Sequence, residues 1–173
     1  MLPSIAGAVA LIIGCTAMGF YFAAKEGLRV RDLQEFKKAL MILSSEIEHM
    51  RAPLPVACAN IAKRTTKQVS TLFLEFSKLL EASEGETAYQ LWMQALEGQK
   101  PYVHLAEEDW EIMESFGKTL GYLDKNMQQN AIAYAVEYID EKTAGLLAQA
   151  DKNKRMYRSL GVIGGLLLAI VLW

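Results

Sequence analysis

Five carboxylates form the densest group of side chains in this 173-residue chain that could carry out chemistry. They are Glu107, Glu108, Asp109, Glu111 and Glu114. Acid–base catalysis would need an apolar pocket that raises the pKa of one carboxyl group, and no apolar run surrounds this stretch. We therefore expect an exposed turn and a half of helix, whose acidic side chains stabilise the positive N-terminal end of that helix.

The histidines and cysteines do not form a pattern that is typical of a metal site or of a nucleophile. His49 and His104 lie in different segments, and Cys15 and Cys58 are far apart in the chain. No glycine-rich loop precedes Lys-Ser or Lys-Thr, and no nucleophile elbow is present. We expect no catalytic residue, no metal ligand and no cofactor, which indicates that the protein is not an enzyme.

The charged residues are confined to the middle of the chain. All 18 Lys and Arg and all 20 Asp and Glu lie between Lys25 and Arg158, while 52% of the whole chain is hydrophobic. This distribution excludes a disordered tail, a collagen and a disulfide-rich secreted module. It is typical of an ordinary water-exposed domain between two apolar ends.

Residues 1–24 and 159–173 are each predicted to form a transmembrane helix. Leu2–Ala24 has no charged side chain and would span about 34 Å as a helix, against about 30 Å of hydrocarbon. The final 15 residues span only about 22 Å, but neighbouring arginines can extend to the membrane surface. A lipoprotein signal ending at Cys15 and a cleaved signal peptide are the alternatives for the first segment, and a buried core helix is the alternative for the second.

Basic residues near these segments predict the orientation of the chain. Lys25, Arg29 and Arg31 follow the first segment, and Lys152 and Lys154 precede the second. Because basic residues favour the cytoplasmic side, the domain of residues 25–158 is expected in the cytoplasm, where free cysteines are also stable.

Small residues at a spacing of four predict close packing between the two membrane helices. They are Ala10 and Gly14 in the first helix, and Gly161 and Gly165 in the second. The alternative is that glycine and alanine are simply common in membrane helices.

Apolar residues recur at helical spacing throughout the middle domain, and no strand alternation is present. This pattern predicts an all-α bundle of about six helices. The stripe from Leu33 to Met50 marks the first helix and fits either a core face or a self-association seam. Pro53 and Pro55 end it. The other helices are expected over 55–64, 69–80, 88–96 after a cap at Thr87, 107–120, and from about 124 with a stripe of Met127, Ala131, Tyr134 and Tyr138.

The middle domain carries its charge unevenly. Residues 25–78 have a net charge of +4, residues 81–141 of −10, and residues 142–158 of +4. The basic parts suit an acidic membrane leaflet, and the acidic part does not suit a nucleic acid. Glu107, Asp109, Glu111 and Glu114 are the predicted surface for a basic protein partner, with a merely solvated helix face as the alternative.

Four segments together resemble the stage III sporulation protein AB family of endospore-forming bacteria. They are LSSEIEHMRAPLPVA (43–57), TAYQLWMQAL (87–96), LAEEDWEIMESFGKTLGYLDKNMQQNAI (105–132) and KNKRMYRSLGVIGGLLLAIVLW (152–173). The most specific parts are Glu-Asp followed by Phe-Gly-x-x-Leu-Gly, up to Gly121, and the Lys-Arg-Met-Tyr-Arg-Ser-Leu-Gly that leads into the last segment. The first segment is shared in outline with the platform proteins of type II secretion and type IV pilus machines, whose cytoplasmic domains are six-helix bundles.

The resemblance implies a non-enzymatic platform or adaptor subunit of a secretion-like channel between mother cell and forespore, needed for endospore formation. The subunit would lie in the mother-cell membrane that faces the forespore, in contact with membrane lipid. Its cytosolic bundle would contact a hexameric secretion ATPase and other channel subunits. A homo-oligomer is compatible with the sequence. The alternative is a membrane-anchored sensor that binds a different protein partner, or a small ligand in an apolar pocket.

Overall fold

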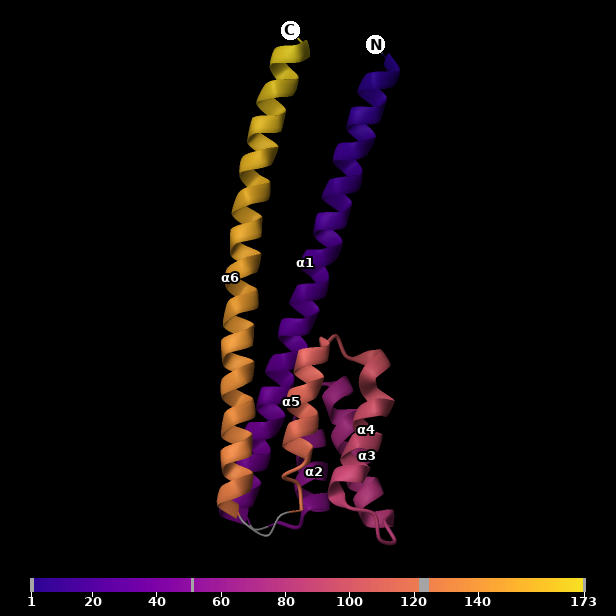
Figure 1. Ribbon diagram of the computed structural model, residues 1–173, viewed down its shortest axis with the longest axis vertical. Helices are drawn as coiled ribbons and strands as arrows, with labels where there is room; N and C mark the ends of the chain where they lie inside the picture. Colours follow the sequence, from indigo (N-terminus) through magenta and orange to yellow (C-terminus); the bar gives the residue numbers. More distant parts are fainter. Residues whose placement is uncertain (1, 51, 122–124, 173) are drawn as a thin grey trace. The chain divides into compact units, whose positions relative to one another are not determined.

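The computed structural model describes the backbone of residues 2–50, 52–121 and 125–172, and the side chains of residues 24–48, 52–121 and 125–152. All regular structure in this part of the chain is helical (Figure 1). The elements are α1 (Leu2–Ser45), a π-helical turn (Glu46–Met50), α2 (Leu54–Ala62), α3 (Lys67–Ala82), α4 (Ala88–Gln99), a 3-10 turn (Lys100–Tyr102), α5 (Glu107–Gly117) and α6 (Lys125–Leu172). The predicted all-α fold with six helices is confirmed.

The chain divides into two compact units, one of residues 28–141 and one of residues 1–27 together with 142–173. The two predicted membrane segments belong to the second unit, and nearly all of their side chains lie outside the described residues, as do the surroundings of Ala10, Gly14, Gly161 and Gly165. In the part of the chain whose side chains are described, no helix is long and apolar enough to cross a bilayer. The boundaries at 24 and 159 and the packing of the small residues stay predictions.

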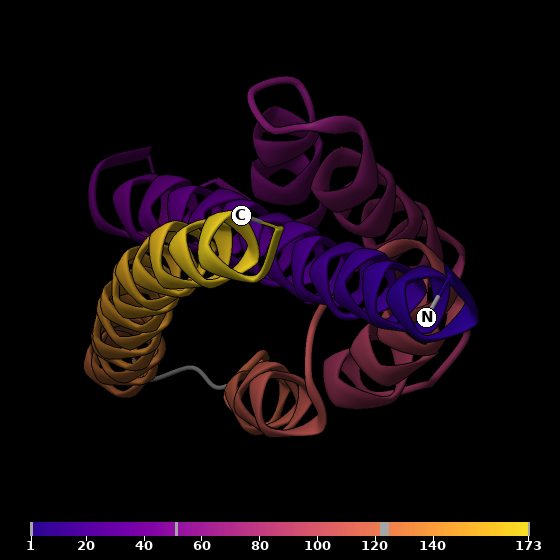
Figure 2. The ribbon, with the colours of Figure 1, turned by 90° about the horizontal axis from the view of Figure 1, so that it is seen from above.

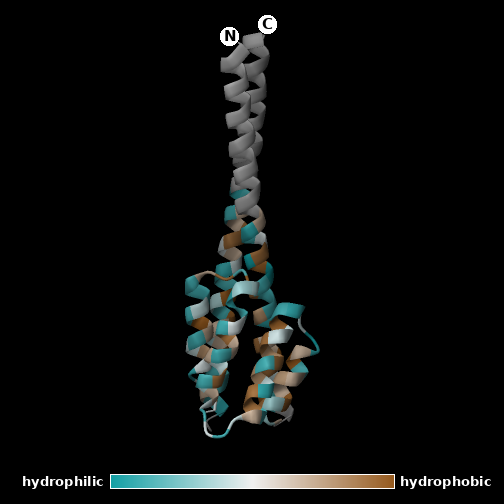
Figure 3. Ribbon diagram, turned by 90° about the vertical axis from the view of Figure 1, so that its right-hand side faces the viewer, coloured by the Kyte–Doolittle hydropathy of each residue, from teal (hydrophilic) through white to brown (hydrophobic). Residues whose placement is uncertain are grey.

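In the unit of residues 28–141, α1 is the helix around which α2 to α5 lie (Figure 2). Leu33, Phe36, Leu40 and Leu43 on α1 are almost completely buried within a single chain. The apolar stripe that begins at Leu33 had been predicted to be either a core face or a self-association seam. As far as Leu43, it is a core face. Each fully buried side chain of this kind stabilises a fold by about 1.5–3 kcal/mol. Figure 3 shows that the helices of the bundle each carry both hydrophilic and hydrophobic residues, as amphipathic helices around a shared core do.

The first helix does not continue as a regular α-helix up to Pro53, as the sequence had indicated. Five residues before Ala52 and Pro53 form a π-helical turn, and such turns are rare outside functional or strained positions. Glu46, the first of them, is 8% exposed. One of its carboxylate oxygens lies 3.4 Å from Asn60 Nδ2, and the other has no hydrogen-bond partner among the described residues. Periodicity did not predict this turn.

Trp92 holds α3, α4 and α5 together. Its ring lies 5.5 Å from that of Phe73, 5.1 Å from that of Phe76 and 5.7 Å from that of Phe116. Its indole Nε1–H donates to the carbonyl oxygen of Met113 at 2.9 Å, so the buried polar group is satisfied. Tilted and edge-on aromatic pairs of this kind add to the free energy of burial.

The Phe-Gly-x-x-Leu-Gly motif is explained by this packing. Phe116 and Leu120 are buried, and a Cβ on Gly117 would overlap Cδ1 of Trp92. Gly121 has a φ of 90°, a left-handed conformation that favours glycine and turns the chain away from α5. The predicted cap at Thr87 is also present, since Thr87 Oγ1 accepts from the backbone N–H of Gln90.

The stripe predicted for α6 is partly wrong. Met127 and Tyr134 are 50% and 62% exposed, and the buried positions are Ile132, Ala135 and Ile139. Methionine and tyrosine are amphipathic or adaptable side chains, so their spacing alone did not identify the inward face.

We predict that Gly117→Ala destabilises the bundle by about 2 kcal/mol or more, because the new methyl group must displace a fully packed tryptophan. Urea unfolding followed by circular dichroism would measure the free energy of unfolding. Gly98→Ala is the matched control, since nothing lies within 4 Å of a Cβ there. We expect that change, within α4, to be neutral or stabilising by up to about 1 kcal/mol. Equal effects of the two substitutions would contradict the packing argument.

Candidate functional site

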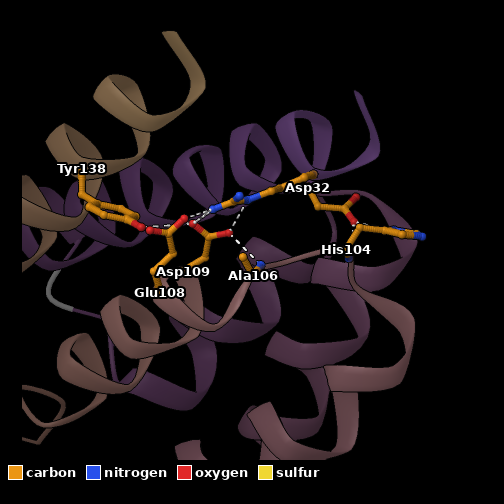
Figure 4. A network of polar contacts seen from close by, with 7 residues as sticks. Asp32, His104, Ala106, Glu108, Asp109 and Tyr138 are labelled. Atoms are coloured by element: carbon orange, nitrogen blue, oxygen red, sulfur yellow. Dashed lines mark hydrogen bonds and ion pairs between the residues drawn. The ribbon is translucent and has the colours of Figure 1, made fainter. Parts of the chain in front are cut away.

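An ion pair between part-buried Arg29 on α1 and buried Asp109 on α5 is the centre of the polar network in Figure 4. Arg29 on α1 donates from Nε to Oδ2 of Asp109 at 2.7 Å and from Nη2 to Oδ1 at 2.9 Å. Asp109 is completely buried. Arg29 Nη2 also donates to Oε1 of the more exposed Glu108 at 2.7 Å. Two parallel bonds between a guanidinium and a carboxylate are strong and restrict the geometry of both groups.

Two further donors complete the surroundings of Asp109. The backbone N–H of Ala106 donates to Oδ2 at 2.9 Å, which satisfies a donor at the N-terminal end of α5. The hydroxyl of Tyr138 on α6 donates to Oδ1 at 3.2 Å. A buried carboxylate is tolerated when its oxygens are paired in this way. The site therefore joins α1, α5 and α6 within one unit.

The protonation states of Arg29 and Tyr138 are fixed near neutral pH. The hydrogen bond to Asp109 raises the pKa of Arg29, so Arg29 stays a cation. Burial, with the negative charge of Asp109 as a further cause, raises the pKa of Tyr138, so its hydroxyl stays a donor. Side chains that keep one protonation state and join two helices stabilise the structure and are not suited to transfer protons.

A second buried carboxylate attaches the loop before α5 to α1. Asp32 is 3% exposed, and its Oδ2 accepts from the backbone N–H of His104 at 2.9 Å and lies 3.1 Å from the Nδ1 of that residue. Arg31 lies 3.5 Å from the other oxygen. His104, which had no predicted role, is therefore a loop anchor.

The first part of α6 is joined to α1 along its length. Lys37 Nζ donates to Oδ2 of Asp140 at 2.7 Å, and Ser44 Oγ to Oε1 of Gln129 at 2.6 Å. Lys125 Nζ donates to the carbonyl oxygen of Glu48 at 2.9 Å. As the residue number rises along α1, the number of its partner on α6 falls. These two stretches therefore run antiparallel.

The interpretation of the five carboxylates as one exposed acidic turn is wrong for Asp109. Asp109 lies on the same side of α5 as Met113 and Phe116, four and seven residues on, and so faces the core. Glu107 and Glu111 are exposed and Glu114 is half-buried. The predicted partner surface is thus reduced to Glu107, Glu111 and Glu114, and it stays a prediction.

The described residues give little support to ligand chemistry. They include no group of three or more His, Cys, Asp or Glu that could hold a metal ion. Burial raises the pKa of the Cys58 thiol to about 12, which makes that thiol unreactive near neutral pH. A hollow of about 600 Å³ lies at the surface, and it is lined by Thr87, Ala88, Tyr89, Lys118, Leu120 and Gly121.

Comparison with known proteins decides the family. The model of the family "Stage III sporulation protein AB" matches residues 4–173. This chain belongs to the stage III sporulation protein AB family. The resemblance inferred from the four sequence segments is confirmed. The family is named for sporulation and not for an enzymatic activity.

Two relatives support the assignment. Stage III sporulation protein AB of Bacillus subtilis (strain 168) is 34% identical over 166 residues, which are 96% of each chain. A solved structure of stage III sporulation protein AB (SpoIIIAB) is 31% identical and superposes with a TM-score of 0.67. The superposition covers 72% of this chain and 97% of the chain in the solved structure. The helical bundle described above is therefore similar to an experimentally known fold.

We predict that Asp109→Asn destabilises the protein by about 3 kcal/mol, because it removes the buried charge that pairs with Arg29. Thermal and urea unfolding of the full chain in detergent would measure the change. Glu107→Gln is the matched control on the exposed side of the same helix turn, with an expected change within about 0.5 kcal/mol.

A double-mutant cycle would separate the ion pair from the other contacts of Asp109. Arg29→Met combined with Asp109→Leu leaves no unpaired buried charge, so the double variant should lose less free energy of unfolding than the sum of the two single variants. Strict additivity would show that the two side chains do not depend on each other.

Proposed function

We propose that this protein is a non-enzymatic platform or adaptor subunit of a secretion-like channel between mother cell and forespore, needed for endospore formation. In this role the chain is anchored in the mother-cell membrane by residues 1–24 and 159–173, and its bundle contacts a hexameric secretion ATPase and other channel subunits. Membership of the sporulation family supports the proposed part in endospore formation. The observation that carries the mechanical role is the buried Arg29–Asp109 pair.

The ion pair gives the bundle the rigidity that an adaptor needs. A partner that pushes on α5 displaces Asp109, which is held by two bonds to α1 and by one to α6. Both of these helices continue beyond the bundle, α1 from residue 2 and α6 to residue 172. Because a packed core is stiff, displacement of one helix moves its neighbours with it. The bundle is thus suited to transmit force.

The exposed side of α5 is the proposed ATPase contact. Glu107 and Glu111 project from the same helix that carries Asp109 inward, so a basic partner bound there would act directly on the ion pair. Charge complementarity of this kind mainly steers association and selects the partner.

The alternative, a sensor for a small ligand, has weaker support. It requires an enclosed apolar pocket with a few inward polar groups. The centre of the bundle is instead filled by Trp92 and the rings around it. The hollow beside Tyr89 and Lys118 lies at the surface. We therefore favour the platform.

Membrane anchoring can be tested by extraction and by proteolysis. We expect the chain to stay with the membrane during an alkaline carbonate wash, because two apolar helices would remain in the bilayer. In sealed protoplasts, external protease should remove tags from both ends and leave the centre intact. Release of the whole chain by carbonate, or digestion of its centre from outside, would refute the anchoring and its orientation.

Charge reversal tests the ATPase contact. The variant Glu107→Lys, Glu111→Lys, Glu114→Lys should lower recovery of the ATPase in a pull-down at least tenfold, because like charges then face each other. Asp109 is left unchanged so that the fold is preserved. The control variant reverses three exposed carboxylates elsewhere, Glu75, Glu81 and Glu84. Undiminished recovery with the first variant would exclude this surface.

A further inference from the structure

The turn between α2 and α3 carries an exposed group of cations. Lys63, Arg64 and Lys67 lie within five residues, all three are exposed, and no acidic residue lies between them. In the described part of the chain, no ion pair of these three side chains is formed. Their positive charge is therefore available to a partner.

The local backbone of the turn is satisfied within the chain. The hydroxyls of Thr65 and Ser70 donate to the carbonyl oxygens of Ile61 and Ala62, which covers the negative end of α2. At the start of α3, the side chain of Thr66 makes no capping hydrogen bond, but the backbone N–H of Thr66 donates to the carboxylate of Glu35. The positive potential of the turn therefore comes from the three side chains, which can pair with phosphate groups.

The turn is attached to the first part of α1. Oε2 of Glu35 accepts from the backbone N–H of Thr66 at 2.9 Å. Arg31 lies four residues before Glu35, on the same side of α1, and its side chain is 55% exposed. Arg31 therefore lies near the turn, with its Nη2 also 3.5 Å from Oδ1 of Asp32, and Glu35 accepts a hydrogen bond from the backbone of the turn.

The turn is attached to α1 a short way along the chain from the proposed first membrane segment. Glu35 lies eleven positions after Ala24, and both belong to α1. Eleven helical steps span about 16 Å. A site on so short a tether meets the membrane surface at a high effective concentration, so weak individual contacts are sufficient.

The second loop at this end of the bundle also suits a membrane surface. It is attached to Asp32, three residues from Glu35, by the backbone N–H of His104. Tyr102 in this loop is 65% exposed. Tyrosine is enriched where lipid headgroups meet the hydrocarbon region, because its ring is apolar and its hydroxyl is polar.

We propose that the α2–α3 turn, with Arg31, binds the headgroups of acidic phospholipids in the membrane that anchors the chain. This proposal rests on the membrane anchoring proposed above. The contact restrains the bundle against the bilayer when a partner acts on α5. Lipid is favoured over an acidic protein because the turn is attached at Glu35, only eleven positions along the chain from the segment that we propose to enter the membrane.

The test uses the full chain in lipid nanodiscs, with Cys15→Ser and with a fluorophore on Gln68→Cys; the buried Cys58 remains unlabelled. The discs contain phosphatidylcholine alone or with a third of phosphatidylglycerol, and a nitroxide on some headgroups quenches the label. We expect at least twofold stronger quenching in the acidic discs, and loss of the difference in high salt.

Two matched variants decide whether these cations are responsible. The variant Lys63→Gln, Arg64→Gln, Lys67→Gln should abolish the difference between the discs. The control variant Lys38→Gln, Lys78→Gln, Lys118→Gln removes three exposed cations elsewhere and should keep it. Circular dichroism would verify that both are folded.

The outcomes separate this proposal from the one it rests on. A chain that does not enter the discs overturns the membrane anchoring, and the lipid contact with it. A chain that enters them but is quenched equally in both lipids, or is quenched in the first variant as in the control, overturns the lipid contact alone. An acidic protein surface would then be the remaining candidate partner of the turn.

Discussion

The buried pair of Arg29 and Asp109 constrains the whole bundle. A carboxylate without solvent access is costly unless its oxygens are paired, and Asp109 obtains donors from α1, from the start of α5 and from α6. None of these three elements can shift without breaking a bond to the same side chain. The side chain of Asp109 therefore fixes α1, α5 and α6 relative to one another. The apolar core around Trp92 packs against these helices.

The outer surface of the bundle follows from the same arrangement. Since Asp109 faces inward, the neighbouring Glu107 and Glu111 face outward from α5. The α2–α3 turn, attached to α1 through Glu35, carries the opposite charge. One face is thus suited to a basic protein and another to acidic headgroups, with a rigid core between them. This division is compatible with the adaptor role proposed above.

The helices were largely predictable from the sequence, because each has an apolar stripe and local signals such as Thr87 and Gly121. The candidate site was not. Asp109 was grouped with its acidic neighbours, since a polar residue at an inward position is recognisable only once its partner is known. That partner, Arg29, is 80 residues away in the chain. The one local signal was the spacing of Asp109 from Met113 and Phe116, which continues the buried side of α5. The π-helical turn at Glu46 had no local signal that we recognise.

The sequence separation within the ion pair also bears on the order of folding. Bringing together groups 80 residues apart costs more chain entropy than closing the short turns between α2, α3 and α4. During synthesis, moreover, Arg29 leaves the ribosome well before Asp109 exists. Until then the guanidinium stays hydrated, while α1 can already pack against α2 and α3 through its buried stripe and through Glu35. A nascent chain interrupted before α5 therefore lacks the carboxylate that pairs with Arg29.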